Sequence, residues 1–458
     1  MSSAVADLLE ADTRKPTPHQ DRALQELLEW WNLPQDHPQW QNCVLQAPAG
    51  CGKTFLAKYF TGMLKDALPV FTATTNEAAK QLALAGVDVW GTIHSALGLV
   101  KRNNAEQTYF VQNQIPEDIY EYNLLVIDEA SMAGIANPDD ENTYPLIVDY
   151  VIELGMRTLW LGDPYQLPPV EAEDGISPVF TQGWRTVTLS EIMRNSGDIL
   201  EYCTKLRSII DMQSRTFPRA PKCATVHTIS HTILYRALRN AEKLEELRKG
   251  TTRIIVWKNS NADRINNFIR IGLHGDELAR KYSLLPTDQV LFTAPVFWGN
   301  FPEDPDHLDS RELQLKATVN TRAEVISTQQ TTLYGLAVFR CKFRLEEGGE
   351  ILGYVLTDEG KARFEKLKKA FIKSIEAAGA RKKADSWVWW HTFDSCFVKL
   401  KHSYAITCHR SQGSNIPNVI VDVKDILSAS WKQPLLAYKL VYTACSRTKQ
   451  HLTLVREL

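Results

Sequence analysis

A chain of 458 residues, 44% hydrophobic and 23% charged, has the composition of an ordinary globular protein and is long enough for about two to four domains. No apolar run approaches the ~20 residues of a membrane-spanning helix, and the first residues lack the basic-then-apolar order of a secretory signal. The net charge of −2 excludes a uniformly basic surface for nucleic acid, so any such surface has to be local. Eight cysteines without a Cys-x-x-Cys pair argue against zinc knuckles and disulfide frameworks, and indicate a reducing compartment.

The first predicted element is a helix that begins after Pro18, because Ala23, Leu24 and Leu27 are spaced to form one apolar face. Gln20 lies at its start, and its amide can both donate and accept, so it can recognise the edge of a nucleotide base. A solvent-exposed glutamine at a helix start is the alternative, and it is favoured when Gln20 is considered alone.

The next stretch follows the apolar run Cys43–Leu45 and reads Ala-Pro-Ala-Gly-Cys-Gly-Lys-Thr over residues 47–54. A strand, a turn of small residues and a Lys-Thr pair that opens a helix form the pattern of a phosphate-binding loop. Lys53 can reach the β- and γ-phosphates, and the hydroxyl of Thr54 can hold Mg²⁺. Ala47 replaces the usual first glycine of the pattern. The remaining predicted nucleotide contacts of the loop are Pro48, Ala49, Gly50, Cys51 and Gly52.

A short strand over residues 69–75, a helix from Asn76 to Gly86 and a strand edge over 89–95 follow the loop. The polar segment between Leu99 and Tyr122 is predicted to contain a small hairpin around residues 107–111. That hairpin is either an ordinary surface feature or one displayed for a function.

The stretch over residues 124–131 is predicted to be a buried parallel strand that ends in two acids, Asp128 and Glu129. Parallel sheets of α/β proteins place ligand chemistry at the carboxyl edge, where Asp128 would lie near Mg²⁺ and Glu129 could deprotonate an attacking water. Another strand over 157–161 leads to Gly162–Pro169, where Gln166 could contact the γ-phosphate.

The second half of the chain begins with predicted helices over 199–212, 234–250 and 261–271 and a strand over 252–257. Short β-rich pieces at 289–294, 323–328 and 337–344 then indicate a small inserted β-barrel. A basic helix is predicted over residues 361–383, which hold nine Lys/Arg, and Trp387, Trp389 and Trp390 follow it. These tryptophans either stack on single-stranded nucleic acid or pack the helix onto the body. Strands at 418–423 and 451–455 complete the chain.

Taken in order, these stretches resemble the motif set of the superfamily 1 helicases, on the 5′→3′ branch that includes RecD and the phage Dda helicase. The resemblance extends from about Thr17 to Val455. It implies an α/β fold with two RecA-like P-loop NTPase domains that bind ATP and Mg²⁺ between them. The first domain would cover residues 1–190, and the second 191–285 and 401–458, with 286–400 inserted into the second.

The resemblance assigns the nucleotide-side motifs, in chain order, to Gln20, Gly50–Thr54, Asp128–Ser131, Gly162–Pro168, His409–Gly413 and Tyr442–Arg447. Gln412 and Gly413 would therefore join the nucleotide site. Arg194 and Arg447 look like the family's two arginine fingers, which would reach the nucleotide from the second domain. Lys53, Glu129 and Gln166 would complete the catalytic set. Such an arginine is worth about 10³–10⁵ in rate, because negative charge spreads over the phosphoryl oxygens in the transition state.

On the DNA side, residues 73–79 and 92–95 resemble the two motifs that grip a single strand, although the family usually has a proline where this chain has Thr74. The hairpin within residues 99–122 is similar to the strand-separating pin of Dda, and the inserted β-rich segment with its basic helix is similar to the SH3-like β-barrel and tower of Dda. The candidate DNA contacts are Thr75, Asn76, Thr92, His94, Phe110, Thr407 and His409.

The sequence thus predicts an ATP-dependent DNA helicase that moves 5′→3′ on single-stranded DNA and unwinds tailed duplex DNA. We expect a monomer without membrane contact, in the cytoplasm of a bacterium or a phage-infected host, with a single-strand-binding or replisome protein as a further partner. Two alternatives stay open at this stage: an RNA helicase of the same superfamily, and an ATP-driven translocase that displaces proteins from DNA without unwinding. The presence of both Glu129 and Gln166 favours an intact hydrolase over a purely structural role.

Overall fold

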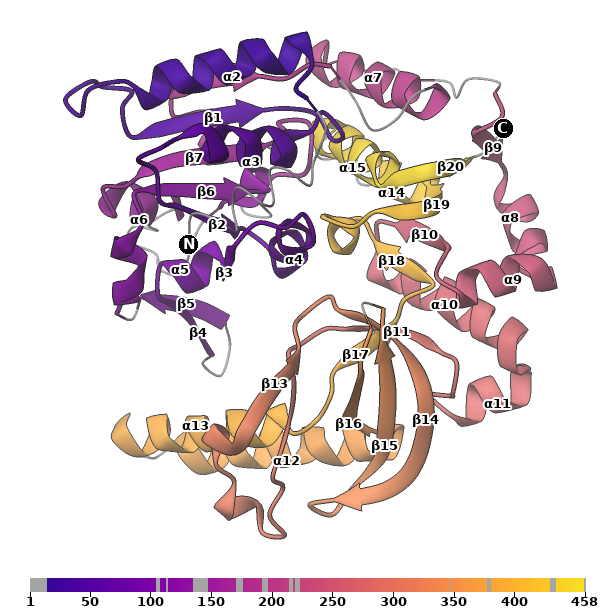
Figure 1. Cartoon of the computed structure of the whole chain (residues 1–458). Helices are drawn as coiled ribbons and strands as arrows, with labels where there is room; N and C mark the ends of the chain where they lie inside the picture. The colour runs from indigo at the N-terminus through magenta and orange to yellow at the C-terminus, as the bar shows by residue number, and fades with distance from the viewer. Residues whose placement is uncertain are drawn as a thin grey trace. The chain divides into compact units, whose positions relative to one another are not determined.

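The computed structural model describes residues 15–103, 108–112, 114–134, 147–169, 176–191, 197–213, 217–218, 223–346, 348–376, 380–428 and 434–456. Its contacts divide the chain into two compact units (Figure 1). The first unit is Met1–Thr228 with Ser411–Leu454, and the second is Ile229–Arg410 with Val455–Leu458. Among the described residues, no helix combines the length and apolar character needed to cross a membrane.

The first unit contains a six-stranded sheet in the order β3-β2-β6-β7-β1-β8, and every neighbouring pair is parallel. This parallel α/β sheet is the RecA-like architecture that the sequence predicted for the first domain. The strands are β1 (Asn42–Gln46), β2 (Pro69–Ala73), β3 (Val89–Thr92), β6 (Leu124–Asp128), β7 (Arg157–Gly162) and β8 (Arg185–Thr188).

Both faces of this sheet are buried, because successive side chains of a strand point to opposite sides. Leu45 joins a core cluster with Leu27, Trp30 and Phe60, whereas its neighbour Val44 joins a second cluster. The main helices of this unit are α2 (Pro18–Trp31), α3 (Lys53–Met63), α4 (Asn76–Leu84), α5 (Ile93–Ala96), α6 (Ile147–Glu153) and α7 (Asp198–Asp211). Short 3₁₀ turns lie at Glu117–Glu121, Ala130–Met132 and Pro178–Phe180.

The C-terminal part of the chain contributes the helices α14 (Val423–Leu427) and α15 (Pro434–Ser446) to the first unit. Strand β19 (Ile416–Asp422) neighbours β20 (Thr448–Val455), which in turn neighbours β9 (Val226–Ile229). Helix α15 packs against α7.

The predicted hairpin is present as strands β4 (Leu99–Asn103) and β5 (Thr108–Gln112), which pair antiparallel. The register places Phe110 opposite Lys101. The side chain of Phe110 lies outside the part of the structure that is described, so its role as a wedge stays a prediction.

In the second unit, β10 (Thr252–Val256) pairs in parallel with β18 (Ala405–Thr407). The prediction of one helix over 234–250 is wrong, because α8 ends at Ala237 and α9 begins at Ala241. The side chain of Asn240 causes the break, since it accepts hydrogen bonds from the backbone N–H groups of Glu242 and Lys243 and so caps α9. The helices of this part are α8 (His231–Ala237), α9 (Ala241–Arg248), α10 (Asn259–His274) and α11 (Asp276–Lys281).

The β-rich segment forms an antiparallel five-stranded sheet in the order β16-β15-β14-β11-β17, and the strands β12 and β13 form a separate pair. Three of these strands were expected, but β14 is longer than predicted, and four were missed. Their bounds are β11 (Gln289–Phe292), β12 (Val296–Gly299), β13 (Leu313–Ala317), β14 (Arg322–Leu333), β15 (Leu336–Leu345), β16 (Glu350–Leu356) and β17 (Leu400–His402). Further 3₁₀ turns lie at Pro305–His307, Ser310–Glu312 and His409–Ser411.

The single basic helix predicted over residues 361–383 is also wrong. Helix α12 (Asp358–Glu376) is followed by a second helix, α13 (Ala380–Ser395), which carries the tryptophans. Trp390 is buried, and its ring lies 4.8 Å from Phe371 and 5.3 Å from Phe364 of α12. The indole N–H of Trp389 donates to the carbonyl of Pro305 at 3.0 Å. These two tryptophans therefore pack α13 against α12 and its surroundings, as the second of the two interpretations expected.

Candidate active site

The loop between β1 and α3 has the backbone that a phosphate-binding loop requires. Gly50 and Gly52 have φ angles of 89° and 81°, in the left-handed region that favours glycine. A Cβ atom at Gly52 would lie 2.8 Å from Nε2 of Gln20. Helix α3 begins at Lys53 without a side-chain cap, so its first N–H groups have no side-chain acceptor at the helix start. Unpaired N–H groups at a helix start attract anions, so the loop fits a bound phosphate group.

The hydroxyl of Thr54 and the carboxylate of Asp128 come together at the edge of this loop. Thr54 Oγ1 donates to Asp128 Oδ2 at 3.3 Å, and Asp128 Oδ1 accepts from the backbone N–H of Glu129 at 2.8 Å. A hydroxyl and a carboxylate are oxygen ligands of the kind that Mg²⁺ prefers, so the pair fits a magnesium ion. The ammonium group of Lys53 donates to the carbonyl of Ala47 at 2.9 Å and thus lies over the same loop.

Asp128 and Glu129 form a pair of acids at the carboxyl end of β6. Burial raises the pKa of Asp128, against the opposing effect of Lys53. Burial also raises the pKa of Glu129; Arg447 opposes this shift, and the charge of Asp128 adds to it. Glu129 has a φ angle of 53°, an uncommon conformation for a residue with a side chain and one that is enriched at functional sites. A carboxyl group with a raised pKa is suited to act as a general base.

Gln166 connects this acid pair to the arginine after α15. With its amide oriented to satisfy both neighbours, Gln166 donates to Glu129 Oε2 at 3.2 Å and accepts from Arg447 Nη2 at 3.1 Å. Arg447 is also held by its own turn, since its Nε donates to the carbonyl of Thr443 and its Nη2 to Ser446 Oγ. Both Gln166 and Arg447 are buried. Three residues far apart in the sequence therefore form one chain of hydrogen bonds.

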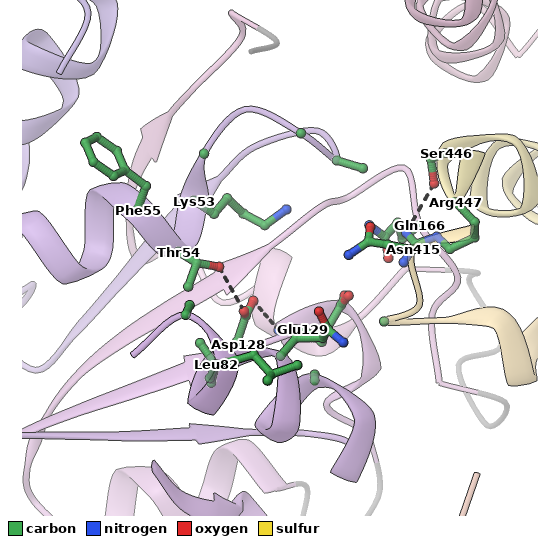
Figure 2. A pocket seen from close by; sticks show the side chains of 18 of the residues that line it. Lys53, Thr54, Phe55, Leu82, Asp128, Glu129, Gln166, Asn415, Ser446 and Arg447 are labelled. Carbon is green, nitrogen blue, oxygen red and sulfur yellow. Dashed lines mark hydrogen bonds between the residues drawn. The ribbon is translucent and has the colours of Figure 1, made fainter. Parts of the chain in front are cut away.

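These groups line a pocket of about 590 Å³, a size typical of small-molecule sites. Figure 2 shows Lys53, Thr54, Asp128 and Glu129 toward one side of the pocket and Gln166, Asn415, Ser446 and Arg447 toward the other. The predicted residues that line it are Ala49, Gly50, Gly52, Lys53, Thr54, Asp128, Glu129, Gln166, Gly413 and Arg447.

Four predicted nucleotide contacts do not line this pocket: Gln20, Pro48, Cys51 and Gln412. The amide of Gln20 is held by backbone groups, because Nε2 donates to the carbonyl of Cys51 and Oε1 accepts from the N–H of Thr17. Cys51 is fully buried, and burial raises the pKa of its thiol to about 11. Gln412 is buried, and neither atom of its amide has a hydrogen-bond partner among the described residues.

Sequence reasoning missed Asn415 and Ser446, which line the pocket, and Asp163, which lies beside the phosphate loop. Asp163 was within Gly162–Pro168, one of the stretches assigned to the nucleotide-side motifs, so the signal for it was present. Ser446 was likewise within the assigned stretch Tyr442–Arg447, whereas Asn415 offered only its closeness in sequence to His409–Gly413. Arg194, the other predicted arginine finger, lies outside the described residues.

Four of the predicted DNA contacts of the first unit, all except Phe110, lie where β2 and β3 end. Thr75 caps α4 after β2, and Thr92 caps α5 after β3, while Ala73 and Thr92 are partners in the register of these two strands. Asn76 begins α4, and His94 lies within α5, where burial lowers its pKa to about 4. In the second unit, Thr407 is a buried residue at the end of β18, and the ring of His409 lies 5.7 Å from that of Trp257.

Comparison with known proteins agrees with this geometry. Residues 19–209 match the family model of an AAA domain, and residues 402–455 match that of a UvrD-like helicase C-terminal domain. These two matches, in this order, support a superfamily 1 helicase of the RecD and Dda type, as the sequence predicted. The protein is an ATP-hydrolysing helicase, as the sequence predicted.

Individual relatives are more distant. An uncharacterized protein, R530, of Acanthamoeba polyphaga mimivirus is 27% identical over 382 residues, which cover 72% of this chain and 74% of that protein. Among solved structures, Bacteroides Pif1 bound to single-stranded DNA has a TM-score of 0.48 at 16% identity, covering 97% of this chain and 93% of that one. Pif1 from Candida albicans has a TM-score of 0.45 at 17% identity, with coverages of 97% and 95%.

Proposed function

We propose that this helicase moves 5′→3′ along single-stranded DNA and separates tailed duplexes by hydrolysing ATP in the pocket of the first unit. The observation that carries the proposal is the convergence on one pocket of the phosphate loop, the acid pair, Gln166 and Arg447. The direction of movement rests on the resemblance of the ordered motifs to those of RecD and Dda.

In this proposal, ATP supplies the phosphoanhydride bond that is broken, and Mg²⁺ reduces the charge of its phosphate groups. The N–H groups from Gly50 to Lys53 and the ammonium group of Lys53 hold the phosphates. Thr54 and Asp128 hold the ion. The side-chain Nε2 and Oε1 atoms of Gln412 have no hydrogen-bond partner among the described residues. A bound ligand or a rearrangement of the loop can provide partners for both atoms.

Glu129 is the proposed general base. Gln166 holds its Oε2 atom in place, so the carboxylate keeps one orientation while its raised pKa favours accepting a proton from water. Arg447, on the other side of Gln166, provides positive charge where negative charge develops, and Arg194 is the proposed second arginine. Because Gln166 contacts both Glu129 and Arg447, movement of one is transmitted to the other.

The proposed contacts with the single strand are Thr75, Asn76, Thr92 and His94 in the first unit, and Thr407 and His409 in the second. The β4–β5 hairpin, with Phe110 in the middle of β5, is the proposed strand separator. We retain the domain boundaries 1–190, 191–285, 286–400 and 401–458 as part of the proposal, with an SH3-like barrel and a helical tower in the insertion.

Helix α12 adds a surface that fits DNA phosphates. Lys366, Lys369 and Lys373 are exposed and recur at positions i, i+3 and i+7, so they share one face. The buried residues Phe364 and Ile375 mark the opposite face. Since Trp389 and Trp390 are used in packing, this face is suited to contact phosphates through charge instead of stacking on bases.

The test is ATP-dependent unwinding of two DNA duplexes that are identical except for their tails, one with a 5′ tail and one with a 3′ tail. Separation only from the 5′ tail supports the proposal, and separation only from the 3′ tail overturns its direction. Strand-stimulated ATP hydrolysis without unwinding of either duplex would favour a translocase that displaces proteins. Stronger stimulation of the ATPase by RNA than by a matched DNA strand would favour an RNA helicase. Lys53→Ala is the site control, because it should abolish the stimulated hydrolysis.

A further inference from the structure

Asp163 is a fully buried carboxylate that lies between the phosphate loop and helix α15. Its Oδ2 atom accepts from the backbone N–H of Ala49 at 2.9 Å and from the hydroxyl of Tyr442 at 2.8 Å. Its Oδ1 atom accepts from the N–H of Tyr165 at 3.0 Å. The hydroxyl of Tyr442 also lies 3.4 Å from the N–H of Ala49. One carboxylate therefore joins the loop, the segment after β7 and α15.

Helix α15 contacts the same segment at two further points. The ammonium group of Lys439 donates to the carbonyl of Pro164 at 2.8 Å, one helical turn before Tyr442. Arg447 follows the end of α15 and contacts Gln166. The position of the Arg447 guanidinium therefore depends on how firmly α15 is held against residues 163–166.

The hydrogen bond between Tyr442 and Asp163 is built to be strong. A buried carboxylate is costly unless it is hydrogen-bonded, and an O–H donor to an ionised acceptor forms one of the stronger hydrogen bonds of proteins. Tyr442 is itself buried, and burial together with the charge of Asp163 raises its pKa well above the ordinary value. The hydroxyl thus remains a donor over the whole working range of pH.

We propose that Asp163 and Tyr442 are positioning residues, whose hydrogen bond fastens α15, and with it Arg447, to the phosphate-binding loop. The inference rests on the proposed function, because it gives the pair a role in placing the proposed arginine finger. It assigns no contact with the nucleotide to either side chain. Its consequence is that loosening α15 should lower the rate of hydrolysis more than the affinity for ATP.

The test compares Tyr442→Phe with Tyr438→Phe, which makes the same change on the same helix. The ring of Tyr438 stacks against Phe217 at 6.1 Å, away from Asp163, and this packing survives the loss of a hydroxyl. We expect Tyr442→Phe to lower the kcat of DNA-stimulated ATP hydrolysis by about 10- to 100-fold, the effect of losing one hydrogen bond to a charged group. The KM for ATP should change less than about twofold, because the phosphate loop is retained.

A second readout needs neither nucleotide nor DNA. Amide hydrogen exchange over residues 434–447 of the nucleotide-free protein should become faster in Tyr442→Phe and should not change in Tyr438→Phe. Unchanged exchange in Tyr442→Phe, equal losses of kcat in both variants, or a loss confined to KM would overturn the inference. If the wild-type protein showed no DNA-stimulated hydrolysis, the proposed function would fail, and the exchange experiment would still decide whether the pair fastens α15.

Asp163→Asn provides the remaining test of the pair. If Tyr442 acts through Asp163, the double variant should have a kcat less than about twofold below that of Asp163→Asn alone. If the fold-loss of kcat in the double variant equalled the product of the two single fold-losses, the residues would act independently, and the inference would be overturned.

Discussion

Replacing Glu129 by glutamine should make the protein both inactive and more stable. The amide has the shape of the carboxyl group and keeps an oxygen that can accept from Gln166, which lies 3.2 Å from Glu129 Oε2. It removes the proposed general base, which typically contributes about 10²–10⁴ in rate. We therefore expect kcat for DNA-stimulated ATP hydrolysis to fall by about that factor.

The gain in stability follows from the sign of the pKa shift. Burial and the charge of Asp128 raise the pKa of Glu129 above its ordinary value of 4.5, so the native state binds a proton more readily than the unfolded state. At neutral pH the carboxylate consequently lowers the free energy of unfolding. Glutamine removes this cost. We expect the free energy of unfolding to rise by about 1 kcal/mol, within the range of single stabilising substitutions. For a unit of this size, that change raises Tm by about 2–4 °C.

The assay measures Tm of the nucleotide-free wild type and of Glu129→Gln between pH 7.5 and pH 4.5. The difference should be largest at pH 7.5 and should shrink as the pH falls through the raised pKa of Glu129 toward 4.5, where both states become protonated. A variant that is less stable than the wild type at pH 7.5, or that keeps more than a third of the wild-type kcat, would refute this reasoning.

Three further outcomes are expected. Replacing Lys366, Lys369 and Lys373 together by alanine should weaken binding to forked DNA and reduce the slope of log K against log[salt] by up to about 2.7, or 0.9 per lost phosphate contact. Phe110→Ala should lower the rate of unwinding severalfold while ATP hydrolysis and translocation on a single strand are retained. His94→Gln should reduce the loss of the free energy of unfolding between pH 6.5 and 4 by the order of 2 kcal/mol. Burial keeps His94 neutral in the folded state down to about pH 4, whereas the unfolded chain protonates it below about pH 6.5.

Each of these outcomes has a control. Alanine at three exposed lysines elsewhere in the chain, Lys205, Lys249 and Lys281, removes the same charge and should leave the salt slope for forked DNA nearly unchanged. Equal losses of unwinding, translocation and ATPase in Phe110→Ala would rule out a wedge. An urea titration at pH 7.5, where His94 is neutral in both states, should give wild-type stability for His94→Gln; parallel pH curves for the two proteins would contradict the assignment.

The sequence predicted the parts of this protein that depend on local pattern. The strands β1, β2, β6 and β7 and the helices that follow the phosphate loop were expected close to their observed bounds, because their apolar periodicity and their glycine signals are local. Lys53, Thr54, Asp128 and Glu129 could be identified for the same reason, since parallel strands bring their carboxyl ends to one edge. The break near residues 238–240 and the end of α12 at Glu376 were missed because a helical periodicity can continue across such a boundary.

Only the tertiary structure decided what each side chain faces. The sequence could not say whether Trp389 and Trp390 meet bases or the protein, since either use presents the same aromatic pattern; the packing of α13 on α12 decided it. The sequence likewise gave no reason to join Asp163 to Tyr442, which lie 279 positions apart. Periodicity determines which residues of an element are buried, but the partner of a buried carboxylate depends on how distant segments cross in space.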